Sequence, residues 1–307
     1  MACLTARQFT LPWRMHHRLP DPGQNQSNGN AADFSKDAAG ADAFANDDEM
    51  YGLIHAMRTR VITSPSFTGG KVLAAILFKR TMDGEADGKP VPQALADRGV
   101  LPFLKVDKGL EDPANGVKLM KPMPELNALL ARGKAKVIVG TKMRSVIDEA
   151  NPAGIASIVA QQFEVANQII DAGLIPIVEP EVSIGSASRA EAEDILLAEL
   201  TKALDAQAEG REVMLKLTIP VKPDLYASLV AHPRVARVVA LSGGFSRDEA
   251  CIELKKNHGM IASFSRALLS DLRADMSDEQ FDATLGKAID RFAPLRPAKG
   301  GRAAHSR

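Results

Sequence analysis

Short apolar runs alternate with amphipathic helical patterns along most of this 307-residue chain. Strand–helix–strand repetition is typical of a parallel sheet covered by helices, because parallel strands need long crossover connections. An eight-stranded (β/α) barrel, the TIM type of α/β fold, is the arrangement that a chain of this length favours. The runs lie at residues 72–78, 100–106, 136–142, 174–180, 212–219, 237–243 and 260–265.

The number of runs leaves the first strand of the barrel doubtful. Seven runs follow residue 40, one fewer than the barrel needs. The missing strand would have to come from residues 1–40, which show no sustained period and contain the polar stretch PDPGQNQSNGN. We predict that this segment is mostly disordered, with residues 5–13 as a weak alternative edge strand. The barrel is expected over 41–293, followed by a basic flexible tail at 294–307.

Two of the helical patterns lie in the middle of the chain. Apolar residues recur at every third or fourth position over 155–172 and again over 189–207. Gly173 follows the first pattern and is expected to cap that helix at its C-terminal end.

Charge and cysteine content exclude several classes of function. The 38 basic and 38 acidic side chains give no net charge, so nothing favours nucleic acid or an acidic membrane as a partner. No apolar run reaches the roughly 18 residues of a spanning helix, and no secretory signal is visible. Two cysteines cannot form a disulfide framework or a metal cluster, which fits a reducing compartment. We expect a cytoplasmic protein that binds small molecules; its oligomeric state cannot be read from the sequence.

Four charged residues occur in or at the end of the apolar runs with constant spacing. Lys105, Lys142, Glu179 and Lys216 each follow the previous one by 37 residues. One strand–helix unit takes about 30 residues or more, so these residues occupy corresponding places in successive units. The C-terminal ends of all the strands open on the same face of a barrel, and active sites are found on that face. The spacing therefore predicts that the four side chains meet, although any single lysine here could instead be a solvated strand end.

Lys216 is the candidate nucleophile. It lies between apolar neighbours, and burial together with a second ammonium, such as that of Lys142, should lower its pKa. A neutral amine can attack a carbonyl and form an imine. Glu179 is a candidate proton shuttle because burial should raise the pKa of its carboxyl group, with Glu181 two positions on. The alternative for Glu179 is a structural ion pair with Lys142 or Lys216.

Two later segments have the character of anion sites. Ser242, Gly243 and Gly244 follow an apolar run and precede a helical pattern, where backbone N–H groups can approach a phosphate. Arg266 follows the last run, and the loops after strands seven and eight are a common phosphate site in such barrels. Ser246 and Glu249 fit a capping box, which is a structural role.

No metal site is expected. None of the six histidines ends a predicted strand or forms a ligand pair at useful spacing. Activation of a carbonyl would therefore come from an amine, without a metal or an organic cofactor.

The chain resembles a known protein family over most of its length. The short bacterial branch of class I fructose-bisphosphate aldolases is similar over about residues 41–292, and its motifs occur here in the same order. They read FLKVDKGL (103–110), GTKMRS (140–145), PIVEPEV (176–182), MLKLTIP (214–220), LSGGFSRDEA (241–250) and ASFSRAL (262–268).

The resemblance implies a role for each matching residue. Lys216 corresponds to the lysine that forms a Schiff base with dihydroxyacetone phosphate, and Lys142 to the lysine beside the imine. Glu179 corresponds to the proton acceptor, and Glu181 to its neighbouring acid. Contacts with sugar phosphate are implied for Lys105, Lys108, Ser242, Gly243 and Arg266. The implied reaction is the reversible cleavage of fructose 1,6-bisphosphate to two triose phosphates in glycolysis and gluconeogenesis.

The resemblance does not extend to the start of the chain. The family has a first strand ending in an aspartate that assists carbon–carbon cleavage, and residues 1–40 contain no such pattern. Two alternatives therefore stay open. One is an impaired barrel that only binds sugar phosphate or partners; the other is a different Schiff-base lyase or a transaldolase-like enzyme.

Overall fold

The computed structural model describes residues 2–4, 47–264 and 266–292. The predicted tail at 294–307 and residues 5–46, including the alternative strand at 5–13, lie outside the described residues. Within them, no helix is both long enough and apolar enough to cross a membrane.

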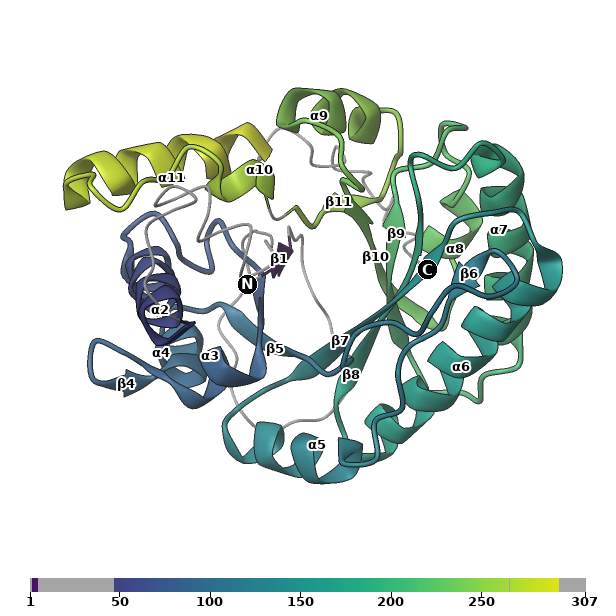
Figure 1. The fold of residues 1–307 in the computed structure, drawn as a ribbon, viewed down its shortest axis with the longest axis horizontal. Helices are drawn as coiled ribbons and strands as arrows, with labels where there is room; N and C mark the ends of the chain where they lie inside the picture. Colours follow the sequence, from purple (N-terminus) through teal and green to yellow (C-terminus); the bar gives the residue numbers. More distant parts are fainter. Residues whose placement is uncertain (1, 5–46, 265, 293–307) are drawn as a thin grey trace, which may run out of the picture.

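Seven parallel strands form one curled sheet, at the places where the apolar runs predict them (Figure 1). Their neighbours along the sheet are also their neighbours in sequence, as in a TIM-type barrel. In chain order they are β2 (Ala74–Leu77), β5 (Leu101–Lys105), β7 (Gly140–Ile147), β8 (Ile175–Val182), β9 (Val213–Thr218), β10 (Val235–Leu241) and β11 (Ile261–Ala262).

The N-terminus adds a short strand to one edge of this sheet. β1 (Ala2–Leu4) pairs with β2 in the antiparallel direction, with Ala2 opposite Ile76. Among the described strands, β1 does not pair with β11 at the opposite edge, so the sheet is open there. The α/β TIM-type architecture is confirmed, and its first position holds a strand of reversed direction.

The start of β7 differs from the prediction. The apolar run at 136–142 suggested a strand throughout, but its first residues form the turn after α5 (Leu126–Ala135). Val137 adopts φ 58°, a left-handed conformation that is unusual for a β-branched residue. The N–H of Ile138 donates to the carbonyl of Gly133 and completes the turn. Alternation of apolar residues cannot distinguish this turn from a strand.

Helices surround the outside of the sheet (Figure 1). The predicted helix at 155–172 is α6 (Pro152–Asp171), and Gly173 follows it with φ 78°, as expected for a C-terminal cap. The predicted helix at 189–207 is α7 (Arg189–Asp205). The others are α2 (Asp47–Thr63), α3 (Lys79–Asp83), α4 (Val91–Asp97), α8 (Ala227–Val230), α9 (Arg247–Lys255), α10 (Arg266–Leu269) and α11 (Asp278–Phe292).

Two small antiparallel pairs complete the described secondary structure. β3 (Glu85–Ala86) and β4 (Lys89–Pro90) form a hairpin before α4. β6 (Val117–Lys118) pairs with the last residues of β7.

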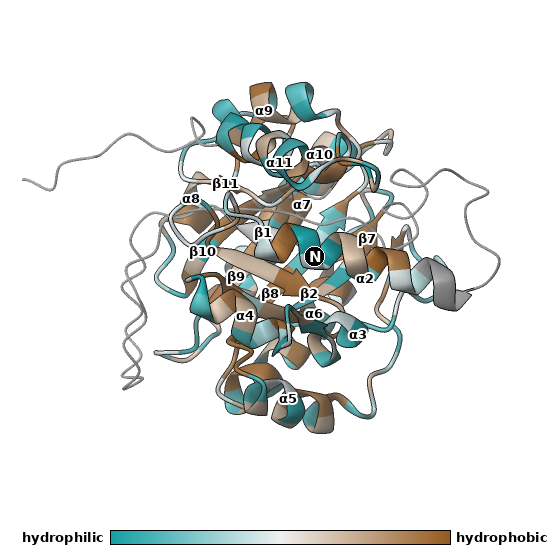
Figure 2. Cartoon of the chain, turned by 90° about the vertical axis from the view of Figure 1, so that its left-hand side faces the viewer, coloured by the Kyte–Doolittle hydropathy of each residue, from teal (hydrophilic) through white to brown (hydrophobic). Residues whose placement is uncertain are grey.

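The apolar core has two parts. The larger lies between the sheet and the helices, so the strands are apolar and the helices show polar outer surfaces (Figure 2). The smaller consists of strand residues and their flanks alone, and it fills the inside of the curl. Its buried members are Leu73, Ala74, Ile76, Phe103, Ile177, Met214, Val239 and Ile261.

Candidate active site

Strand alternation places charged residues directly above the inner apolar core. Successive side chains on a strand point to opposite faces, so residues i and i+2 lie on the same face. Lys105, Glu179 and Lys216 each stand two residues after an inner-core residue of the same strand. Lys142 is paired with Lys105 in the register of β5 and β7. The predicted convergence of the four residues follows from this register.

A glycine keeps the layer below these charges compact. Gly140 lies two residues before Lys142 on β7, at the level of the inner core. A Cβ atom at Gly140 would stand 2.3 Å from the Phe103 ring and 2.4 Å from the Ile175 carbonyl oxygen. A side chain at this position would therefore displace the Phe103 ring or the backbone of β8, so only glycine fits.

The charged side chains form a continuous row. We use the name charge row for Lys105, Asp107, Lys142, Glu179 and Lys216, in which cations and carboxylates alternate. The Glu179 carboxylate lies 2.9 Å from the Nζ of Lys142 through Oε2 and 2.9 Å from the Nζ of Lys216 through Oε1. Asp107 lies 3.5 Å from Lys142 and 2.5 Å from Lys105. Lys142, Glu179 and Lys216 are 4%, 3% and 6% exposed.

The two lysines beside Glu179 differ in pKa. Burial lowers the pKa of Lys216, and the nearby Lys142 ammonium adds to this effect while Glu179 opposes it. Burial would lower the pKa of Lys142 as well, but Glu179 and Asp107 together outweigh it and raise that pKa. Lys216 is therefore the amine of this pair that gives up its proton more readily, in agreement with the sequence-based expectation.

The expectation for the pKa of Glu179 was wrong. Burial alone would raise it, but the ammonium groups of Lys142 and Lys216 lower the pKa to about 2. The sequence argument considered the apolar surroundings and not the two cations that the strand register brings to the carboxylate. Both ion pairs that were held as the structural alternative for Glu179 are present.

Glu181 has the pKa shift that was expected of Glu179. It lies on β8 and is 3.0 Å from the guanidinium of Arg144 on β7. Burial raises its pKa, the negative charge of Glu179 raises it further, and Arg144 and Lys216 oppose the shift. Of the two acids, Glu181 therefore binds a proton more readily near neutral pH.

The backbone at Glu179 is held by a side chain from the helical layer. Strand β8 pairs with β9 only through Ile177 and Val178, so the ladder between them stops where the acids begin. The N–H of Glu179 donates to Oε1 of Gln162 on α6 at 2.8 Å, and the amide of Gln162 donates to the Ser145 hydroxyl at 3.1 Å. Gln162 is completely buried. It holds Glu179 where the pairing with β9 has ended, while the pairing with β7 continues through Arg144.

The loop after β10 has the geometry of a close backbone approach. Gly243 has φ 62° and Gly244 has φ 125°, conformations that favour glycine. A Cβ on Gly243 would lie 2.7 Å from a methyl carbon of Ile184. It would lie 3.5 Å from the methyl carbon of Thr218, which follows Lys216 by two residues on β9. Ser242 is half-buried at the start of this loop. The capping box of Ser246 and Glu249 is confirmed at the start of α9.

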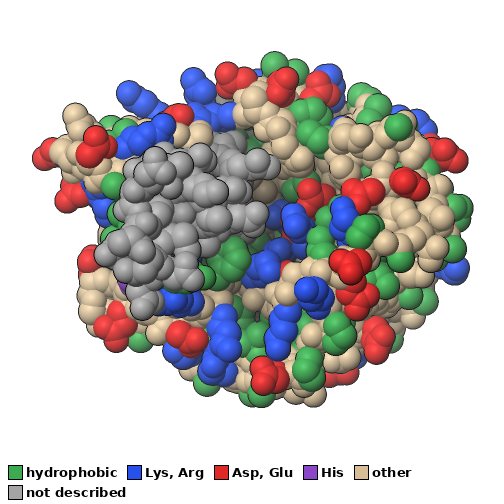
Figure 3. Space-filling view, viewed as in Figure 1, with side chains coloured by type: hydrophobic (Ala, Val, Ile, Leu, Met, Phe, Trp, Pro, Cys, Tyr) green, Lys and Arg blue, Asp and Glu red, His purple; other side chains and the backbone are tan. Residues whose placement is uncertain are grey.

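The other predicted phosphate contacts have different positions. Lys108 is exposed and lies 3.5 Å from Glu125, so it stands outside the charge row. Arg266 is the first residue of α10, four positions after the end of β11, and its side chain lies outside the described part of the chain. Lys and Arg side chains gather around a hollow on the face seen in Figure 1, beside the residues drawn in grey (Figure 3).

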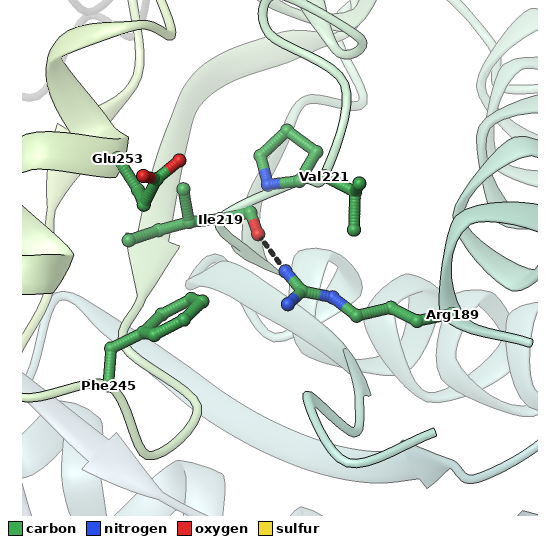
Figure 4. Close-up of a pocket in the computed structure, with 6 residues that line it drawn as sticks. Arg189, Ile219, Val221, Phe245 and Glu253 are labelled. Carbon is green, nitrogen blue, oxygen red and sulfur yellow. Dashed lines mark hydrogen bonds between the residues drawn. The ribbon is translucent and has the colours of Figure 1, made fainter. Parts of the chain in front are cut away.

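A separate cavity of about 200 Å³ lies beside the glycine loop (Figure 4). The guanidinium of Arg189 donates to the Ile219 carbonyl and to Glu193, and Phe245 forms part of the wall next to Gly244. No member of the charge row lines it.

In the described residues, no group of three or more His, Cys, Asp or Glu side chains is arranged to hold a metal ion. His55, His232 and His258 instead bond to the Glu85 carbonyl, Asp205 and Asp224 respectively.

Three residues of the site were not found from the sequence. Asp107 follows Lys105 by two positions inside a quoted motif, so alternation along the strand could have indicated it. Arg144 stands two residues after Lys142 in the same way. Gln162 carries no such signal, because a glutamine in an amphipathic helix is usually a surface residue.

Comparisons with known proteins agree with this geometry. A family model described as fructose-bisphosphate aldolase class-I matches residues 54–228, more than half of the chain. The matched range contains the whole charge row and ends before the glycine loop and Arg266.

Solved structures show the same fold. The fructose-bisphosphate aldolase from Plasmodium falciparum, crystallised with TRAP and a small-molecule inhibitor, aligns with a TM-score of 0.70 and 19% identity, covering 87% of this chain and 88% of that one. Cgl0159 from Corynebacterium glutamicum aligns with a TM-score of 0.51 and 13% identity, covering 88% and 83%. The family match covers more than half of the chain and agrees with the curled sheet and the charge row, so the chain belongs to the class I fructose-bisphosphate aldolase family.

Proposed function

We propose that this chain cleaves fructose 1,6-bisphosphate reversibly to dihydroxyacetone phosphate and glyceraldehyde 3-phosphate through a Schiff base on Lys216. The observation that carries the proposal is the setting of Lys216. Its amine is buried, has a lowered pKa, and lies 2.9 Å from the Glu179 carboxylate, with Lys216 in the second half of strand β9. These are the conditions under which a lysine becomes a nucleophile toward carbonyl carbon.

The first chemical step joins the enzyme to the substrate. The neutral Nζ of Lys216 bonds to the ketone carbon, and the carbonyl oxygen leaves as water with one proton from the amine and one from an acid. The product is an iminium, which keeps one hydrogen on nitrogen. Glu181 is proposed as the acid, because its raised pKa lets it hold a proton.

Cleavage follows from the iminium. A carboxylate takes the hydroxyl proton at C4, the C3–C4 bond breaks, and its electron pair forms an enamine that neutralises the iminium. Glyceraldehyde 3-phosphate leaves as the aldehyde. Protonation of the enamine at C3 regenerates the iminium, and water releases dihydroxyacetone phosphate. Glu179 is proposed as a proton carrier here, and Lys142 stabilises developing negative charge.

A bisphosphate is proposed because anion-binding groups lie on two sides of Lys216. Lys105 is on β5, two strands before Glu179, and the glycine loop follows β10, next to β9. With Arg266 and Lys108, these are the proposed contacts to the two phosphates. Ser242, Gly243 and Gly244 supply backbone groups, and Lys105 supplies charge.

One observation favours a second candidate. The first position of the sheet holds a strand of reversed direction, and the described sheet is open beside it. An open barrel could bind sugar phosphate and cleave it slowly or not at all.

The experiment that separates these functions uses two readings on the purified chain. Borohydride with dihydroxyacetone phosphate should place a stable adduct on Lys216, located by peptide mass spectrometry. A coupled assay should then show cleavage of fructose 1,6-bisphosphate. Lys216→Met should abolish both, while Lys202→Met on the exposed face of α7 should change neither. Binding without an adduct would favour the second candidate.

A further inference from the structure

Lys142 and Lys216 occupy nearly equal positions on either side of Glu179. Each Nζ lies 2.9 Å from its own oxygen of that carboxylate. Their side chains are 5% and 7% exposed. An amine has to be neutral to attack a carbonyl. Some further feature therefore has to decide which of the two gives up its proton.

Asp107 makes the two positions unequal. Its Oδ2 lies 3.5 Å from the Nζ of Lys142, whereas Lys216 pairs only with Glu179 in the part of the chain that the structure describes. Oδ2 is buried and accepts no hydrogen bond from the described residues. Oδ1 is held by Lys105. The carboxylate therefore has a fixed orientation, and its free oxygen faces Lys142.

We propose that Asp107 selects the nucleophile of this site by holding Lys142 as an ammonium ion, so that Lys216 is the lysine that forms the imine. The proposal rests on the imine chemistry proposed above. Asp107 is a positioning residue in this account, because it acts through Lys142 and does not contact the substrate. Lys105 fixes its orientation from the other side.

The other charges near the two lysines do not supply this selection. Arg144, which follows Lys142 on β7, acts in the opposite direction by lowering the pKa of Lys142. Glu181 raises the pKa of Lys216. Both effects reduce the difference in pKa between the two lysines. Asp107, which follows β5, acts the other way by raising the pKa of Lys142. Burial lowers the pKa of Lys105, but that lysine pairs with Asp107 and not with Glu179.

Removing the charge of Asp107 should therefore make Lys142 a second site of imine formation. A neutral Lys142 would bond through Nζ to the same ketone carbon and release water, as Lys216 does. Each unit by which its pKa falls raises the neutral fraction about tenfold while most of the amine is protonated. The effect is clearest when Lys216 itself cannot react.

The test compares three proteins that lack the Lys216 amine. They are Lys216→Met alone, Lys216→Met with Asp107→Asn, and Lys216→Met with Asp194→Asn as a matched control from α7. Asp194 pairs with the surface residue Lys222 and lies outside the charge row. Each protein is treated with dihydroxyacetone phosphate and borohydride, and adducts are mapped by peptide mass spectrometry. Circular dichroism establishes that each is folded.

Adduct on Lys142 should rise at least about tenfold in the Asp107→Asn protein over the other two, corresponding to a fall of one pKa unit. Equal labelling of Lys142 in all three folded proteins would overturn the proposal. If the Asn variant does not fold, Asp107→Ser is the second variant, with the same expected and contrary results. The chain with its native Lys216 is labelled in parallel. Absence of adduct there contradicts the proposed function itself, whereas its presence without the Lys142 effect contradicts only the role of Asp107.

Discussion

The backbone N–H of Glu179 donates to the side chain of Gln162 across the boundary between sheet and helical layer, at 2.8 Å. Replacing Gln162 by Ala leaves that N–H buried without an acceptor and removes the amide that bonds to Ser145. A buried unsatisfied group costs about 1–3 kcal/mol, so the melting temperature should fall. The value of kcat should fall more than KM rises, because Glu179 is a proposed proton carrier. Gln168→Ala, at an exposed position of the same helix, is the control; an equal loss of kcat there would contradict the role of Gln162.

Acid should destabilise the protein through Glu179. Its pKa is about 2 in the folded protein, against 4.5 in the unfolded chain. Between these values the unfolded chain binds more protons, so stability rises with pH and is lost as pH falls from 4.5 toward 2. The difference corresponds to about 3 kcal/mol at neutral pH. Chemical denaturation across this range should give a shallower pH dependence for Glu179→Gln than for Glu191→Gln, an exposed position on α7; identical curves would show that the pKa of Glu179 is not lowered.

Gly243 should tolerate no side chain. Gly243→Ala combines a left-handed backbone with a contact of 2.7 Å to Ile184, so the loop should shift and KM for the sugar bisphosphate should rise. Gly210→Ala has nearly the same strain, with φ 80°, but open space around the added carbon. Both variants should lose stability through backbone strain, Gly243→Ala more because of the contact with Ile184, and only Gly243→Ala should raise KM. A change of KM in neither variant would remove the glycine loop from the proposed phosphate contacts.

Arg266→Ala should weaken substrate binding more than it slows the chemistry of bound substrate. A charge-assisted contact between guanidinium and phosphate is worth about 1.5–3 kcal/mol, so KM should rise about tenfold to a hundredfold. Steady-state kinetics measure both constants. Unchanged KM with a large fall in kcat would place Arg266 at the reacting atoms instead.

Turnover should be insensitive to chelators, because the proposed carbonyl activation comes from the amine of Lys216. Cleavage of fructose 1,6-bisphosphate is measured before and after incubation with EDTA. Loss of activity that zinc restores would contradict the amine mechanism, while equal rates would support it.

The sequence predicts the architecture and the central part of the charge row. The constant spacing of Lys105, Lys142, Glu179 and Lys216 is a property of the strand–helix repeat. It can be seen in the sequence without knowledge of the tertiary contacts. The pKa of Glu179 could not be predicted in this way, since it depends on which strands are neighbours and on their register.

The role of Gln162 and the strand β1 also could not be predicted, because each depends on contacts between segments that are far apart in the sequence. Gln162 becomes part of the site only because β8 separates from β9 after Val178. The three residues of β1 are too few to show a period, so only their pairing with β2 identifies them as a strand.

The charge row contains three lysines and two carboxylates, and this imbalance bears on the covalent intermediate. An iminium on Lys216 carries the same single positive charge as the ammonium that it replaces. The buried row therefore has the same total charge before the substrate enters and after the imine forms, and Glu179 faces a cation in both states. The free energy of removing that cation from water is part of folding the protein, so the reorganisation around the iminium in each turnover is small.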